Sequence, residues 1–116
     1  MRAREIGVVA GAIAGPALVG LAMWSQAAAG PADVTLQLFQ FNPGRLEVKR
    51  GTVVTFTNQD DIRHTVTSGA PDRRDGKFGA ELAGKGAATK VTFTEPGAYP
   101  YFCDRHQAMR GEIQVQ

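Results

Sequence analysis

The 116-residue chain contains a single cysteine, Cys103, so no disulfide can form within it. It has no tryptophan after Trp24, and beyond that point no stretch shows the hydrophobic period of an amphipathic helix. Lysine and arginine number 13 against 11 aspartate and glutamate residues, and no basic run occurs. The sequence therefore excludes a disulfide scaffold, argues against a helical bundle and predicts no nucleic-acid partner.

Charged residues are also missing from residues 6–24, an uncharged stretch that follows a charged start. The small residues Ala27 and Ala29 then form the pattern of a secretory cleavage site. The uncharged stretch is long enough to approach the span of a bilayer as well. We therefore expect residues 1–29 to be a signal peptide or an N-terminal membrane anchor. Residues 30–116 would form one domain in the periplasm or another extracytoplasmic space, with membrane contact only through the leader if it is retained.

A lone thiol in such a compartment is unusual for a small domain. Small exported domains often depend on disulfides for their stability. Here Cys103 would be open to oxidation unless something occupies its sulfur. A bound metal ion would protect the thiol, and its binding free energy would stabilise the fold.

Short segments rich in β-branched and aromatic residues follow the leader, with turn residues between them. We expect strands at residues 34–38, 46–48, 52–58, 64–68, 88–94, 98–103 and 111–115. A phase shift at Phe39 and Phe41 indicates a bulge, and Pro100 marks a bulge or a sheet edge. Residues 69–87 lack a sustained period and read as a long connection with at most one short strand. The pattern predicts an all-β fold, a Greek-key antiparallel β-sandwich of about eight strands.

Cys103, His106 and Met109 stand at even three-residue spacing just after the strand at 98–103. A loop of this size can direct three side chains to one point. The only other histidine, His64, begins an earlier strand. If the two strand ends share one pole of the sandwich, two imidazoles, a thiolate and a thioether converge. This donor set is typical of a mononuclear blue-copper electron-transfer site, whereas structural zinc sites do not use methionine.

Each of these residues alone would carry little weight. A single methionine is usually part of a core, and a buried cysteine usually behaves as a small hydrophobic residue. A cysteine–histidine nucleophile is an enzymatic alternative. No oxyanion-hole motif or orienting acid accompanies the pair, however, and His64 would then have no role. We therefore expect no enzymatic activity.

Three stretches of the chain resemble the small cupredoxins, the type 1 blue copper proteins. They read FNPGRLEVKRGTVVTFTNQDDIRHTVTS, FGAEL and FTEPGAYPYFCDRHQAMRGEIQV. The resemblance covers nearly all of residues 33–116. It is greatest to the amicyanin group, which shares the short Cys-x-x-His-x-x-Met loop, and it extends to the plastocyanins and pseudoazurins.

The resemblance implies one type 1 copper ion held at one end of the sandwich. His64, Cys103 and His106 match the equatorial ligands, and Met109 matches the axial one. His106 would present an exposed imidazole edge for electron transfer. His64 would be buried, with its other ring nitrogen bound to an acceptor outside the ligand set.

The chain departs from the family at two positions beside these ligands. Thr65 stands where relatives often have asparagine, and its hydroxyl is a candidate for the same bridging bond. Gln107 stands where many relatives have proline, so the rigidity of that loop does not carry over. An apolar collar around His106 would come from Phe39 or Phe41 together with Pro43, although these residues fit an ordinary core equally well.

We expect a monomeric one-electron carrier that cycles between Cu(I) and Cu(II). Its redox partners would dock transiently near His106. A copper-binding or copper-delivery protein of the extracytoplasmic space is the alternative. A third option is an accessory domain that docks permanently on one oxidase or reductase.

Overall fold

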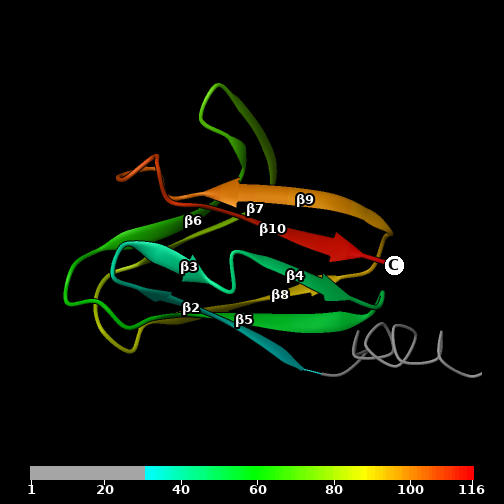
Figure 1. Ribbon diagram of the computed structural model, residues 1–116, viewed down its shortest axis with the longest axis horizontal. Coiled ribbons are helices and arrows are strands. Elements are labelled where there is room, and N and C mark those ends of the chain that lie inside the picture. Colours follow the sequence, from blue (N-terminus) through cyan, green and yellow to red (C-terminus); the bar gives the residue numbers. More distant parts are fainter. Residues whose placement is uncertain (1–30) are drawn as a thin grey trace, which may run out of the picture.

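The computed structural model describes residues 31–116, so the predicted signal or anchor segment, residues 1–29, lies outside the described part. The described residues form nine strands and no helix (Figure 1). None of them belongs to a helix long and apolar enough to cross a bilayer. The strands are β2 (Ala32–Gln37), β3 (Gln40–Asn42), β4 (Arg45–Val48), β5 (Thr52–Asn58), β6 (His64–Ala70), β7 (Arg73–Leu82), β8 (Ala88–Phe93), β9 (Gly97–Phe102) and β10 (Arg110–Val115).

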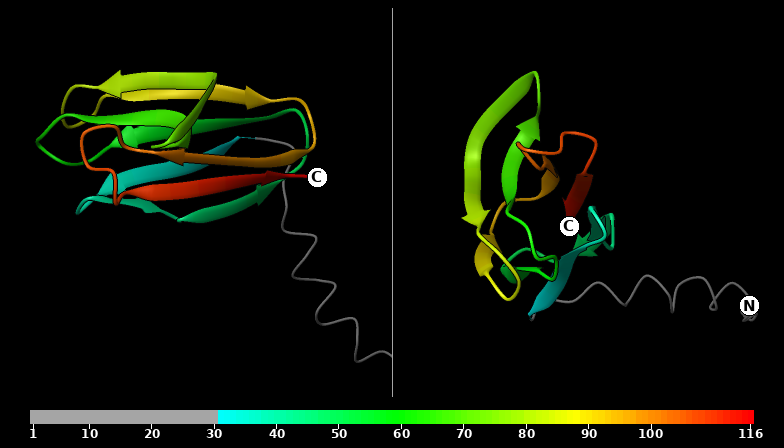
Figure 2. Two further views of the ribbon diagram at one scale, coloured as in Figure 1. Left: turned by 90° about the horizontal axis from the view of Figure 1, so that it is seen from above. Right: turned by 90° about the vertical axis from the view of Figure 1, so that its left-hand side faces the viewer.

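The strands form two sheets that pack face to face (Figure 2). One has the order β4-β10-β9-β6-β7 and the other the order β3-β2-β5-β8. The predicted all-β sandwich is correct, but the sheets are mixed rather than wholly antiparallel. β10 pairs with β4 in parallel, and β2 pairs with β5 in parallel. Parallel neighbours need a crossover connection, and the chain between β2 and β5 supplies one by visiting the other sheet through β4.

The core follows the alternation of side chains along the strands. β5 buries Thr52, Val54, Phe56 and Asn58, with partly exposed residues between them. The Phe56 ring meets Tyr101 of the opposite sheet edge-on, at 5.3 Å between ring centroids. Since each fully buried large apolar side chain contributes about 1.5–3 kcal/mol, this interior stabilises the domain without a disulfide.

Tyr101 also controls the packing of β9 against β10. It lies opposite Gly111 in the strand pair, and a Cβ atom on Gly111 would come within 2.5 Å of the tyrosine ring. The Tyr101 hydroxyl is buried, and it has no hydrogen-bond partner among the described residues. Burial raises the pKa of this phenol above its usual range. The close approach of the Tyr101 ring to position 111 therefore leaves room for glycine alone.

Two local predictions differ from the structure. The phase shift near Phe39 is a two-residue turn and not a bulge, because Leu38 and Phe39 adopt φ values of 55° and 60° and Gln37 pairs with Gln40. Such left-handed turns suit the twist of a hairpin. The long connection predicted at residues 69–87 contains the ten-residue strand β7. β7 lies at a sheet edge with most of its side chains exposed, so it lacks the hydrophobic period that would have revealed it.

The sheet edge predicted at Pro100 is wrong for β9 as a whole, which is an inner strand of its sheet. β9 lies between β10 and β6, but its pairing with β6 covers only Phe102 and Tyr101. Pro100 comes just beyond that pairing, where no N–H is required toward β6.

Both ends of the described chain lie at one pole of the sandwich. β2 begins there and β10 ends there, while the loop between β9 and β10 lies at the opposite pole (Figure 1). The predicted metal site belongs to that opposite pole.

Candidate metal centre

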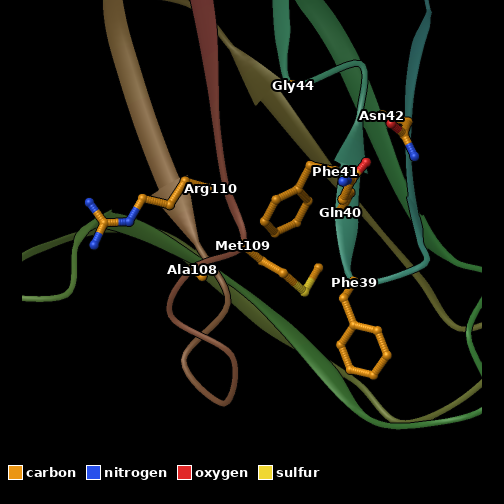
Figure 3. A pocket seen from close by; sticks show the side chains of 8 residues that line it. All are labelled: Phe39, Gln40, Phe41, Asn42, Gly44, Ala108, Met109 and Arg110. Atoms are coloured by element: carbon orange, nitrogen blue, oxygen red, sulfur yellow. The ribbon is translucent and has the colours of Figure 1, made fainter.

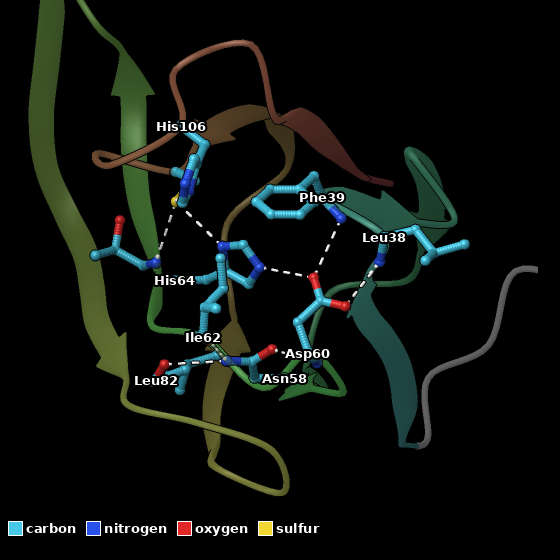
Figure 4. Close-up of polar contacts among 10 residues, drawn as sticks. Leu38, Phe39, Asn58, Asp60, Ile62, His64, Leu82 and His106 are labelled. Carbon is cyan, nitrogen blue, oxygen red and sulfur yellow. Dashed lines mark hydrogen bonds and ion pairs between the residues drawn. The ribbon is translucent and has the colours of Figure 1, made fainter.

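Three of the predicted ligands meet at the pole where β6 begins and β9 ends. β6 and β9 are antiparallel neighbours, so His64 at the start of one lies near Cys103 at the end of the other. His106 follows in the loop to β10. The Cys103 Sγ atom lies 3.8 Å from Nδ1 of His64 and 3.8 Å from Nδ1 of His106 (Figure 4). The three donor atoms all lie within 4.8 Å of one another.

Met109 is the fourth predicted ligand, and the loop carries it back to the same pole. The Met109 N–H donates to the His106 carbonyl at 2.8 Å, and the Cys103 N–H donates to the Met109 carbonyl at 3.1 Å. These two bonds close the loop of residues 103–109. The Met109 thioether is buried and points between Phe41 and Phe39, beside a shallow hollow (Figure 3).

Burial separates the four side chains into two kinds. His64 and Cys103 are fully buried, and Met109 is 3% exposed. His106 alone among them is partly exposed. This difference matches the expectation from the resemblance, in which one imidazole reaches the surface and the other does not.

His64 is oriented by Asp60, which supplies the predicted acceptor outside the ligand set. The His64 Nε2–H donates to Asp60 Oδ2 at 2.8 Å (Figure 4). Because Nε2 then carries the proton, the lone pair of Nδ1 faces the Cys103 sulfur, as a metal ligand requires.

The same carboxylate also holds the turn between β2 and β3. It accepts the N–H of Leu38 at 2.9 Å and that of Phe39 at 3.1 Å. Burial alone would raise the pKa of Asp60. The hydrogen bonds from His64, Leu38 and Phe39 outweigh that effect, so the pKa lies below its usual value. Asp60 therefore remains an ionised acceptor at neutral pH.

Asn58 fixes the segment that leads from β5 to His64. Its side-chain amide donates to the carbonyls of Ile62 at 2.8 Å and Leu82 at 3.1 Å, and its Oδ1 accepts the Asp60 N–H at 2.8 Å. The sequence predicted Asn58 only as the end of the strand at 52–58 and assigned no role to Asp60. An acid four positions before a predicted ligand histidine was the available signal for Asp60.

Thr65 makes the bridge that the family usually assigns to asparagine. Its N–H donates to Cys103 Sγ at 3.4 Å, and its hydroxyl oxygen accepts the Asp104 N–H at 2.7 Å. Thr67 supports that hydroxyl at 3.0 Å. This N–H contact holds the Cys103 sulfur in place beside the two imidazoles. Thr65 therefore joins the two ligand-bearing segments. Gln107 is exposed, and its carbonyl accepts a bond from Arg110.

Phe39 forms the predicted collar, whereas Phe41 and Pro43 do not. The Phe39 ring meets the imidazole of His106 edge-on at 4.9 Å and that of His64 at 5.4 Å between centroids. Phe41 is a core residue that packs against Tyr101, and Pro43 lies exposed in the turn after β3.

The arrangement fits a soft first-row metal ion. Bonds of about 2.3 Å to sulfur and about 2.0 Å to nitrogen, separated by about 120°, set the two donor atoms about 3.7 Å apart. Both sulfur–nitrogen distances here are 3.8 Å. A thiolate and two imidazoles, with a thioether carried on the same loop at Met109, form the donor set that suits copper.

Comparison with known proteins leads to the same metal. The family model "Copper binding proteins, plastocyanin/azurin family" matches residues 28–116. Amicyanin of Paracoccus denitrificans is 30% identical over 92 residues, which cover 79% of this chain and 70% of that protein. The chloroplastic plastocyanin minor isoform of Arabidopsis thaliana is 29% identical over 124 residues, covering 97% of this chain and 71% of that protein.

A solved structure extends the likeness to the fold. A purple cupredoxin from Nitrosopumilus maritimus superposes with a TM-score of 0.67 at 26% identity, covering 73% of this chain and 99% of that one. The resemblance inferred from the motifs is confirmed. The chain belongs to the plastocyanin/azurin family of copper-binding proteins, is similar to the amicyanins within it, and has copper as its cofactor.

Proposed function

We propose that this protein is a type 1 blue copper protein that carries one electron at a time between larger redox proteins, and that it is not an enzyme. The observation that carries the proposal is the convergence of Cys103 Sγ with both histidine Nδ1 atoms at 3.8 Å. In the proposal these three residues would hold the copper ion together with Met109. Bound copper supplies the redox couple, since it alternates between Cu(II) and Cu(I).

The protein supplies a rigid site, which limits rearrangement during electron transfer. His64 is fixed by Asp60, and Cys103 is fixed by the Thr65 N–H. The backbone bonds between Cys103, His106 and Met109 close the loop on itself. A site held in this way is preorganised, so the ligands need little movement when the metal changes its charge.

Electrons would enter and leave through His106, the partly exposed imidazole of the set. Leu38, Phe39 and Ile62 are exposed by 77%, 51% and 40%, the large apolar side chains most exposed among residues 31–116. Phe39 borders the imidazole directly, and Asp60 holds Leu38 and Phe39 in the adjoining turn. An apolar surface of this kind supports the small, transient docking contact expected of redox partners.

Burial of the donors favours a carrier over a copper-delivery protein. Delivery requires that an incoming ligand displaces the metal from its donors one at a time. The Cys103 sulfur, the strongest donor, is fully buried beneath the loop that carries His106. We further propose that the domain is monomeric. We also propose that it works outside the cytoplasm, which the leader-like residues 1–29 support.

An electronic spectrum and voltammetry of the copper-loaded protein test this proposal. We expect an intense blue colour and a reversible one-electron couple. Replacing Cys103 by serine should abolish the colour, while Thr92→Ser on the exposed face of β8 should retain it. A colourless site that holds only Cu(I) would instead identify a copper-delivery protein. Mass spectrometry of the protein from its native host would show whether residues 1–29 are removed.

A further inference from the structure

The hairpin that joins β6 and β7 reaches the loop of residues 103–109 through one arginine. The hairpin stands clear of its sheet above the end of β9 (Figure 1). The Arg74 guanidinium forms an ion pair with the Asp104 carboxylate. It also lies over the Phe102 ring, 5.6 Å from the ring centroid. Arg74 thus contacts the residues on both sides of Cys103.

Gly69 is what directs the hairpin toward this loop. The β6–β7 register shifts between Thr67 and Gly69, and Gly69 lies opposite Arg74. Gly69 has a φ of 101°, and a Cβ there would come within 2.4 Å of the Arg73 carbonyl oxygen. Only glycine tolerates both the dihedral and the close approach. The bulge at Gly69 therefore sets the position from which Arg74 extends.

Phe102 needs the cover that this arginine provides. Tyr101 faces the core, so Phe102 faces outward from the sheet by the alternation of a strand. Phe102 nevertheless has no exposed surface, and it is not a member of the core cluster. The Arg74 side chain lies across it as a flat cation over an aromatic face.

Asp104 is the first residue after the sulfur, and it is held from two strands. Its N–H donates to the Thr65 hydroxyl on β6, and its carboxylate pairs with Arg74 on β7. Thr65 in turn donates its own N–H to the Cys103 sulfur. We propose that Arg74 is a positioning residue that clamps the start of the loop of residues 103–109. The contribution of Arg74 to copper binding rests on the proposed function, but the contacts of Arg74 with Asp104 and Phe102 do not require metal.

The clamp should be sensitive to salt. Arg74 and Asp104 have side-chain exposures of 51% and 39%, so dissolved ions screen their attraction. Raising the salt concentration should weaken the ion pair while leaving the buried Thr65 contacts intact. This dependence separates the clamp from the fixed hydrogen bonds around it.

Amide hydrogen exchange at Asp104, measured by NMR on the full chain, tests the inference. The chain is studied metal-free and loaded with diamagnetic Cu(I). For Arg74→Ala we expect exchange at Asp104 to accelerate about three- to tenfold in both forms, in line with loss of a surface ion pair and a cation–π contact. High salt should accelerate exchange in the natural chain but not in Arg74→Ala.

Arg73→Ala is the matched control, because it removes the same charge from the same hairpin, and its exchange should remain near the natural rate. Equal exchange at Asp104 in the two variants would overturn the clamp. A copper-loaded natural protein without blue colour would overturn the proposed carrier function instead, and the metal-free measurements would still decide the role of Arg74.

Discussion

Replacement of Asp60 by alanine would disturb the metal centre without removing any donor atom. The carboxylate accepts N–H groups from His64, Leu38 and Phe39. The two amides belong to exposed residues and regain water, whereas the His64 ring is fully buried and loses the acceptor that Asp60 provides for its Nε2–H. With about 1.5–3 kcal/mol for a hydrogen bond to a charged group, we expect the free energy of unfolding to fall by about 1.5–3 kcal/mol.

Copper affinity should fall in the same variant, because the His64 ring is no longer held in one tautomer and orientation. Loss of such an outer contact typically weakens metal binding about 10- to 100-fold. Urea unfolding of the metal-free chain measures the first effect, and titration against a competing chelator measures the second. The control is Asp61→Ala, which removes the neighbouring exposed carboxylate. If Asp60→Ala matched that control in both assays, the proposed orientation of His64 by Asp60 would be refuted.

Three further predictions concern the rest of the sandwich, and urea unfolding measures each. Gly111→Ala should lower the free energy of unfolding by about 1–3 kcal/mol, because the new Cβ would lie 2.5 Å from the Tyr101 ring. Gly84→Ala is the control and should lower it far less, since a Cβ there would have no described atom within 4 Å. Similar losses in the two variants would contradict this packing. Tyr101→Phe should leave the free energy of unfolding unchanged or raise it by up to about 1 kcal/mol, since the removed hydroxyl has no hydrogen-bond partner in residues 31–116. A clear loss of stability would contradict this and show that the hydroxyl has a partner. A hydrogen bond from Ser68 lowers the pKa of Asp75, so Asp75→Asn should be less stable than the natural chain at neutral pH. The difference in stability should vanish as the pH falls below the ordinary carboxyl pKa of 3.8. A difference that does not depend on pH would exclude the charge as its cause.

The strands with regular alternation were predictable from sequence, and the irregular ones were not. The segment 52–58 coincides with β5, because it is rich in the β-branched and aromatic residues that favour strands. β7 shows no such signal, since an exposed edge strand can be built from glycine and charged residues. The parallel pairing of β2 with β5 depends on the intervening chain crossing to the other sheet at β4. The alternation of apolar and polar residues does not show where such a crossing occurs.

The donor residues were predictable because they are rare in this chain. One cysteine and two histidines leave few ways to assemble a metal site, and the structure brings all three together. The supporting residues could not be identified in the same way. Asp60 is one of several acids in turns, and its role depends on the turn at Leu38 and Phe39 folding back over His64.

The pole at which the described chain starts and stops has a practical consequence. A lipid, a fusion partner or an electrode linker joined ahead of Ala32 or after Gln116 would attach at the pole opposite the loop between β9 and β10 (Figure 1), the loop that contains His106. The domain would then be held with the partly exposed His106 imidazole turned away from the support and accessible to a protein in solution. Immobilisation through either terminus should therefore preserve electron exchange with soluble proteins.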